Sequence, residues 1–136
     1  MIVDDRLSDD ERMTLKTAGF GAVLLVSNAD PGLLSMIKES FAASDTIAAS
    51  SGLVREVLTG GPLPRLPDDP AAAEEVVFPA LRRSVEILSE RAPDQVDRFR
   101  ATIVAAAHRV ADATEGKSGG EAAMVAKVMA ALGVTP

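Results

Sequence analysis

The chain contains no cysteine, tryptophan or tyrosine, and phenylalanine occurs only four times among its 136 residues. The absence of cysteine excludes disulfide bonds and thiolate metal sites. With so few aromatic rings, a core has to be built from aliphatic side chains and from alanine, the best helix former. A chain of this length is typical of one domain with a core of its own. We therefore expect a single helical domain over residues 1–136.

Basic surface and long apolar runs are also scarce. The formal net charge is −6, and an acidic chain without aromatic stacking platforms is unsuited to nucleic acid. The longest apolar run, residues 22–26, is far shorter than a bilayer span, and no basic segment followed by an apolar one stands at the start. The sequence predicts a soluble, cytoplasmic protein without a membrane span, and its alanine and arginine usage is typical of bacterial coding. Four arginines indicate a solvated helix face: Arg82, Arg83, Arg98 and Arg100.

Local patterns predict helices along most of the chain. In "LSDDERM", Ser8 stands three residues before Glu11, which is the spacing of an N-terminal capping box. Beyond it, apolar residues recur every three or four positions, the period of a helix with one buried face. Asp69 followed by Pro70 places a capping residue before a proline suited to the first helical turn. We expect an all-α bundle of six to seven helices.

The stretch "TAGFGAVLLVSNADPG" has two interpretations. A strand beside a glycine-rich phosphate loop would suggest a nucleotide enzyme, but in that fingerprint the strand comes before the glycines. Here Gly19 and Gly21 precede the apolar run, and the only other strand candidate, residues 76–78, is too short for a parallel sheet. We interpret the stretch as a helix in which the glycines mark a close approach by another helix.

Proline divides the chain near its middle. Residues 60–70 contain four prolines and predict an extended connection, which Leu63 and Leu66 hold against the surface. Pro79 is expected to kink or restart the helix that follows. Further helices are expected at residues 31–41, at 44–59 as one or two short pieces, at 94–116, and at 118–132 with Gly133 as the C-terminal stop.

The two ends of the chain are faintly similar. Residues 15–32 align with residues 99–116 at a constant offset, with alanine, valine and glycine recurring at the same positions. The sequence leaves open whether this agreement records a duplication or is chance in an alanine-rich helical chain. A duplication predicts that residues 15–43 and 99–132 form two similar antiparallel helix pairs, the pseudo-repeated halves of the bundle.

Residues 110–133, "VADATEGKSGGEAAMVAKVMAALG", lead from the end of one helix through a short turn into an apolar helix. This pattern resembles the tellurite-resistance TerB-like domain, in which such a unit appears twice within an all-helical bundle. Glu115 stands where that family has aspartate before glycine, while Ser118 and Glu121 match the family pattern. The resemblance implies a bacterial stress-response module without an established reaction.

The N-terminal copy of the pattern, "VSNADPGLLSMIKES", matches less well. It keeps Asp30, but Pro31 interrupts the aspartate-glycine pair and Lys38 stands in place of the glutamate. From the resemblance we expect a weakly bound divalent cation at Asp30, Glu115 and Glu121. These carboxylates also suit helix caps and turns, and they are too few for a tight site of six or more oxygen ligands. No firmly bound cofactor is expected.

Residues suited to catalysis are few. His108 is the only histidine, and several serines are accounted for as helix caps, so no nucleophile–base pair is recognisable. We expect a non-enzymatic helical binding module that takes a divalent cation, a protein partner or a further copy of the chain. The alternative is a small hydrolase or transferase using a carboxylate base in an interhelical pocket. Convergent carboxylates with a strongly raised pKa would favour that alternative.

Overall fold

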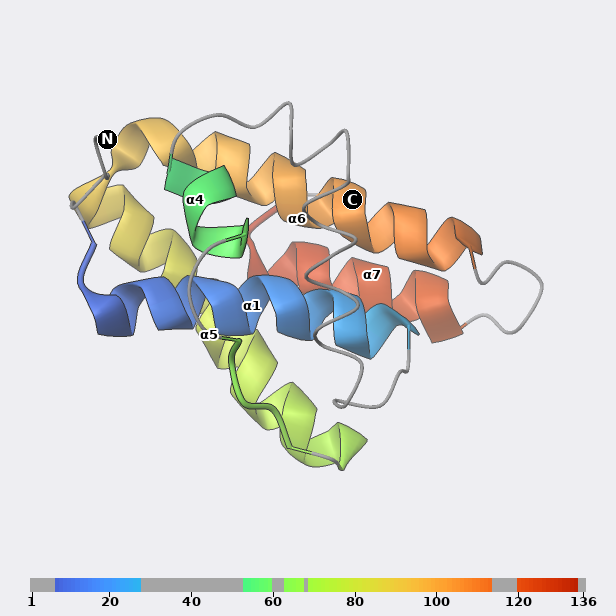
Figure 1. Cartoon of the computed structure of the whole chain (residues 1–136). Coiled ribbons are helices and arrows are strands. Elements are labelled where there is room, and N and C mark those ends of the chain that lie inside the picture. The colour runs from blue at the N-terminus through green and yellow to red at the C-terminus, as the bar shows by residue number, and fades with distance from the viewer. Residues whose placement is uncertain (1–6, 28–52, 60–62, 68, 114–119, 135–136) are drawn as a thin grey trace.

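The computed structural model describes residues 7–27, 53–59, 63–67, 69–113 and 120–134 (Figure 1). These residues are predominantly helical and include no strand, which confirms the expected all-α class for the described ranges. The helices are α1 (Asp9–Ser27), α4 (Leu53–Thr59), α5 (Pro70–Arg91), the 3-10 helix η2 (Pro93–Gln95), α6 (Val96–Ala113) and α7 (Gly120–Ala131). The expected count of six to seven helices is not confirmed by the described part of the chain. The helix predicted at 31–41, the Ser118 cap and the comparison of two halves lie outside the described residues.

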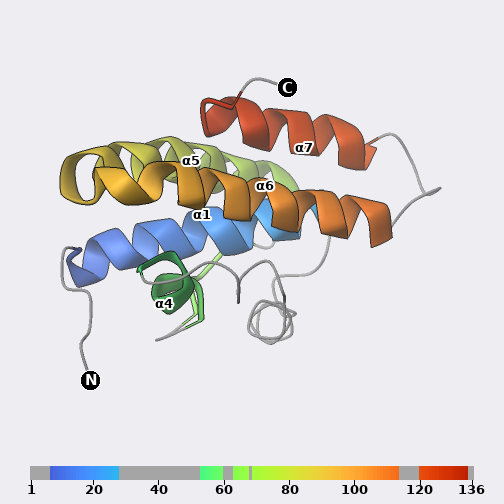
Figure 2. The same cartoon turned by 90° about the horizontal axis from the view of Figure 1, so that it is seen from above.

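Helix α1 is the central element of the bundle. It packs against α4, α5, α6 and α7, and Figure 2 shows α4 and α7 on opposite sides of it. Between Leu15 and Val26 almost every side chain is buried, and only Thr17 and Leu25 are partly exposed. The expectation of one buried face is therefore wrong for this helix. From Ala18 to Val26 the helix is apolar on every side, and such a segment belongs in the centre of a core, where each face has a neighbour.

The two glycines of α1 lie where other helices come closest. A Cβ atom at Gly19 would stand 2.8 Å from Cδ2 of Leu58 on α4 and 3.1 Å from Cδ1 of Ile103 on α6. A Cβ atom at Gly21 would overlap the Val77 side chain of α5, which is fully buried. The predicted close approach of other helices to these glycines is confirmed.

The first turn of α1 joins three helices. Ser8 donates its N–H to Oε1 of Glu11 at 2.9 Å, and Glu11 donates its N–H to Oγ of Ser8 at 3.2 Å, so the predicted capping box is confirmed. Oε2 of Glu11 lies 3.4 Å from Nε of Arg91 at the end of α5. Arg12 forms an ion pair of 2.9 Å with Glu56 of α4. The start of α1 is thereby linked to both α4 and α5.

Helix α5 begins as predicted and continues through its proline. The N–H of Ala72 donates to Oδ2 of Asp69 at 3.1 Å, which confirms the cap. Pro79 lies inside α5 and does not restart it, because the helix runs on to Arg91. Pro79 is exposed, so the Glu75 carbonyl that loses its helical donor can turn towards water. Buried neighbours on the opposite face, including Val77 and Leu81, hold the helix in place.

Residues 63–67 precede α5 and belong to no helix or strand, and Leu63 and Leu66 pack partly against the core. The extended connection over residues 60–70 stays a prediction. Helix α6 departs slightly from its predicted start at Asp94, because a 3-10 turn over Pro93–Gln95 precedes it.

Helix α7 ends at the glycine that the sequence indicates. Gly133 has a φ of +76°, and its N–H donates to the carbonyl of Ala130 at 3.1 Å, while Val134 donates to the carbonyl of Met129 at 2.9 Å. These two bonds form a Schellman motif.

Nε of Arg100 donates to the carbonyl of Leu132 at 2.7 Å. Arg100 is thus half-buried against α7, and its assignment to a solvated face is wrong, while the other three arginines of that group are exposed: Arg82, Arg83 and Arg98.

None of the helices in the described ranges combines the length and apolar character that crossing a membrane requires.

We predict that Gly21→Ala destabilises the fold by up to about 2 kcal/mol, because overpacking against Val77 costs about 1–3 kcal/mol and the gain in helix propensity offsets about 1 kcal/mol. In a Val77→Ala background the two overlapping methyl groups are gone and only Cβ of residue 77 stays close, at 3.2 Å, so the same substitution should destabilise less than in the parent. Urea unfolding of the four variants measures both effects. Equal destabilisation in the two backgrounds would show that the contact with Val77 is not what excludes a side chain at position 21.

Stability should also depend on the charge of Glu11. The N–H of Ser8 and the positive charge of Arg91 lower the pKa of this carboxyl below its usual value, against a smaller opposing effect of burial. A lowered pKa stabilises the fold above the unfolded carboxyl pKa of about 4.3, and this contribution is lost as the pH falls through the lower folded value. Glu11→Gln should therefore be less stable than the parent at pH 7, with a difference that narrows below about pH 4.

Urea unfolding at several pH values checks this expectation. Ser8→Ala is the matched control, because it removes one cap bond at a cost of about 1 kcal/mol but keeps the carboxylate and the Ser8 N–H. The Ser8 variant should retain most of the pH dependence of the parent, because the bond from its hydroxyl is the smallest of the causes that lower the Glu11 pKa. A Glu11→Gln difference that is constant between pH 3 and 7 would contradict the assigned role of the charge.

Candidate functional site

The side chains of the three predicted cation ligands lie outside the part of the chain that the structure describes. Asp30 and Glu115 lie outside the described residues. Glu121 belongs to the first turn of α7, but its side chain also lies outside the description. Within the ranges that the structure describes, no group of three or more histidine, aspartate or glutamate side chains could hold a metal ion. The cation site at these three positions stays a prediction.

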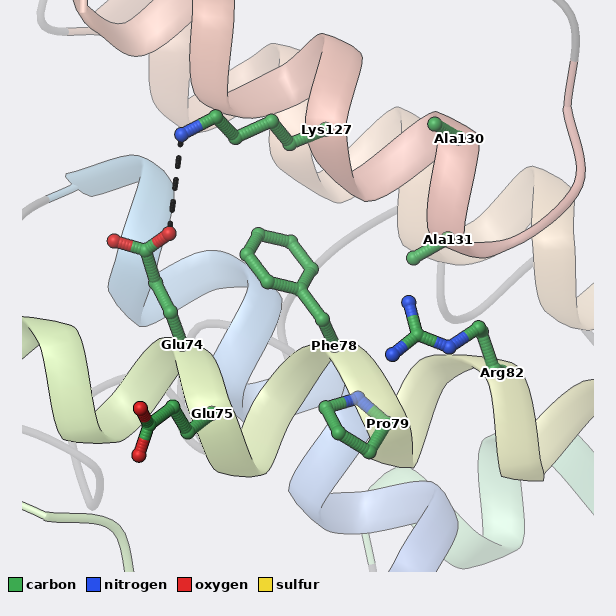
Figure 3. A pocket seen from close by; sticks show the side chains of 8 residues that line it. All are labelled: Glu74, Glu75, Phe78, Pro79, Arg82, Lys127, Ala130 and Ala131. Carbon is green, nitrogen blue, oxygen red and sulfur yellow. Dashed lines mark ion pairs between the residues drawn. The ribbon is translucent and has the colours of Figure 1, made fainter.

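An open groove of about 650 Å³ lies between α5 and α7 (Figure 3). Phe78 of α5 stands in its middle, with its ring leaning towards Glu74 and Lys127, while Ala130 and Ala131 of α7 lie on the other side (Figure 3). Alanine on α7 leaves space that a larger residue would fill, and this is why the two helices enclose a groove there. The lining residues are Glu74, Glu75, Phe78, Pro79 and Arg82 of α5, with Lys127, Ala130 and Ala131 of α7.

Charged groups of opposite sign stand at different places along the groove. Glu74 reaches across to Lys127, with 3.8 Å between the carboxylate oxygen and Nζ. Glu75 points away from Glu74, towards the outside of α5 (Figure 3). Arg82 extends from α5 towards Ala131 at the other side of the Phe78 ring. The two carboxylates do not converge on a common point, so the groove lacks the arrangement in which paired acids share a proton.

A second, smaller hollow of about 310 Å³ lies on the opposite flank of α5, against α1. It is lined by Met13, Thr14 and Thr17 of α1 and by Val76, Pro79, Ala80 and Arg83 of α5. Val76 is a large apolar side chain with 39% of its surface exposed. Pro79 borders both hollows and therefore stands between them.

The outward face of α5 forms a surface that we call the α5 ridge, made of Glu75, Val76, Pro79, Arg82 and Arg83. All five residues are exposed, and their spacing of three and four positions places them on one side of the helix. The centre of the ridge is apolar, with the Glu75 carboxylate before Pro79 and the Arg82 and Arg83 guanidinium groups after it. Glu86 follows on the same side of α5, where it is exposed and forms an ion pair with Arg83. Such a surface can contact the side of another helix through apolar and ionic groups together.

Sequence reasoning missed this surface. Residues 76–78 are too short for a strand and belong to the helix expected from Pro70, but the sequence does not mark which of them face outward. Arg82 and Arg83 are expected only as a solvated face. The available signal was the order of acidic, apolar and basic residues on the outward positions of one helix. That signal becomes visible only when the inward face of α5 is known. His108 is exposed on α6.

Comparison of the chain with protein-family models, with curated proteins and with solved structures produced no match in any of the three. The TerB-like resemblance of residues 110–133 therefore stays a prediction.

The ion pair across the groove should contribute little to stability. The side chains of Glu74 and Lys127 are 34% and 59% exposed, and water screens such pairs. A double-mutant cycle with Glu74→Gln and Lys127→Met should give a coupling of about 0.2–1 kcal/mol in urea unfolding. A coupling above about 2 kcal/mol would show that this pair sets the distance between α5 and α7, since exposed pairs do not reach that value.

Proposed function

We propose that the chain is a non-enzymatic helical binding module that docks an α-helical segment of a protein along the α5 ridge and the adjoining groove. Support comes from the exposed apolar side chains Val76 and Pro79, which stand between two hollows rather than beneath another element. Apolar surface beside a hollow loses unfavourable hydration when an apolar side chain of a partner enters it. An amphipathic helix in a groove is a recurrent way of using such a surface.

The charges of α5 specify the chemistry and direction of the partner. A helix lying antiparallel to α5 places its first half beside Arg82 and Arg83, and its second half beside Glu75. It should therefore carry acidic residues early, an apolar residue at its centre and basic residues late. This order also suits the helix dipole, which favours anions near the N-terminus and cations near the C-terminus. Complementary charges then set the orientation and suppress the reverse one.

Docking on α5 is independent of the other expectations for this chain. Membership of the TerB-like family, a role in stress response, location in the cytoplasm and weak cation binding at Asp30, Glu115 and Glu121 remain predictions from the sequence. None of the three predicted ligands belongs to the α5 ridge. A partner helix could therefore bind whether or not a cation does.

The alternative of a hydrolase or transferase receives no support from the groove between α5 and α7. That alternative needs a carboxylate base directed into a pocket. In the groove, Glu74 is directed at Lys127 and Glu75 points outward (Figure 3). The arrangement suits ionic contacts with a partner better than proton abstraction.

A designed peptide tests the proposed function. The probe is an alanine-based helical peptide with glutamates in its first half, a central leucine and arginines in its second half. We expect it to bind weakly, because one helix face buries less than the roughly 1,200 Å² typical of stable interfaces. NMR amide shifts should gather at Glu75, Val76, Phe78 and Arg82 when the labelled chain is titrated at low concentration.

The matched control is the same peptide with glutamates and arginines exchanged. It has the same composition and apolar anchor, but it places like charges together in the antiparallel orientation. It should bind at least several-fold more weakly. Shifts that are equal for both peptides, or absent from α5, would contradict the proposed docking surface.

A further inference from the structure

The α5 ridge carries the same charge order that its partner helix requires. Glu75 lies four residues before Pro79, and Arg82 and Arg83 follow it by three and four residues. A helix with acidic, apolar and basic residues in that order is therefore present in the chain itself. We infer that the helix which the α5 ridge docks is the α5 ridge of a second copy, antiparallel and related by a two-fold axis beside Pro79. This inference rests on the proposed role of the ridge as a helix-docking surface.

The two flanks of the ridge determine which residues would meet. Glu75 and Arg82 lie on the flank of the α7 groove, while Val76 and Arg83 lie on the flank of the hollow against α1. A two-fold axis between antiparallel helices brings each flank against the same flank of the other copy. Glu75 of one copy then lies beside Arg82 of the other. Because of the two-fold symmetry, the dimer contains two such inter-chain pairs.

The second flank adds an apolar contact. Val76 of one copy lies beside Arg83 of the other, whose aliphatic stem can cover the exposed valine while its guanidinium stays in water. Within its own chain Arg83 pairs with Glu86 at 3.4 Å, and both side chains are more than half exposed. Such a pair contributes little to stability, and a guanidinium has five N–H donors. Arg83 can therefore keep this contact and still pack on Val76.

Pro79 suits the position next to the axis. Its ring is exposed and apolar, and two such rings facing each other place no charge at the centre of the contact. Because Pro79 has no N–H, the carbonyl of Glu75 lacks its usual helical donor. An arginine of the second copy that approaches the Glu75 carboxylate can also donate to this carbonyl.

Self-complementarity favours a second copy over an unrelated protein. In a closed two-fold dimer, one surface patch has to supply both halves of every contact. The α5 ridge does so, because Glu75 lies four residues before Pro79 and Arg82 and Arg83 lie three and four residues after it. Glu86 beyond them is paired with Arg83 of its own chain. A patch of one charge sign would instead repel its own copy and require a different partner.

Sedimentation equilibrium of the full chain tests this inference. The chain should form a reversible dimer at concentrations up to about 1 mM, since small interfaces bind weakly. Glu75→Arg and Arg82→Glu should each weaken the dimer by about tenfold or more, because each creates two like-charge contacts by symmetry. Asp97→Arg on α6 is the matched control and should leave the dimer unchanged, since its side chain is fully exposed and lies off the ridge.

The decisive experiment mixes two variants with exchanged charges at positions 75 and 82. An equimolar mixture of the Glu75→Arg and Arg82→Glu chains should associate as a heterodimer, because both inter-chain pairs become attractive again. The variant carrying both substitutions should dimerise with itself. Glu75 and Arg82 are exposed, and unchanged helical circular dichroism verifies that each variant folds.

The outcomes separate this inference from the proposed function. A parent chain that stays monomeric, or a mixture that does not associate, overturns the two-fold dimer. If the designed peptide still shifts the α5 amides of that monomer, the docking surface stands and its partner is another protein. If the chain dimerises with the expected charge dependence but the peptide neither binds nor competes, docking of other helices is overturned and the second copy remains as the occupant.

Discussion

The close contact between α1 and α5 at Gly21 constrains the rest of the structure. A side chain at this position would overlap Val77, so the two helices can approach only because Gly21 has none. The same helix meets Leu58 of α4 and Ile103 of α6 at Gly19. Since α1 is thereby surrounded, the other helices form a layer around it, and each has one face inward and another outward.

This arrangement explains why α5 exposes apolar side chains. Its inward positions, including Val77, Leu81 and Leu88, are fully buried in the core. Val76 and Pro79 then fall on the outward side, where no described element covers them. Their exposure is a consequence of the helical register that packing against α1 imposes. The hollows beside them follow from small neighbours, since α7 contributes Ala130 and Ala131 to one of them.

Polar contacts link the helices at their ends. The capping box of Ser8 and Glu11 begins α1, and Glu11 also reaches Arg91 of α5. Near the start of α6, Arg100 donates to the carbonyl of Leu132, just past the end of α7. These contacts satisfy backbone groups that helix ends leave without partners. The charges of the α5 ridge are different, because they lie in the middle of a helix where no backbone group requires them.

The local sequence was sufficient to predict the all-α class of the described residues and several helix ends. Capping at Ser8, Asp69 and Gly133 depends on neighbouring residues alone, so these positions could be predicted without a fold. The central place of α1, the half-buried role of Arg100 and the unbroken course of α5 through Pro79 could not. Each depends on contacts between residues far apart in the chain. The α5 ridge belongs to this second group, because a charge pattern becomes a surface only when tertiary packing decides which face of the helix points outward.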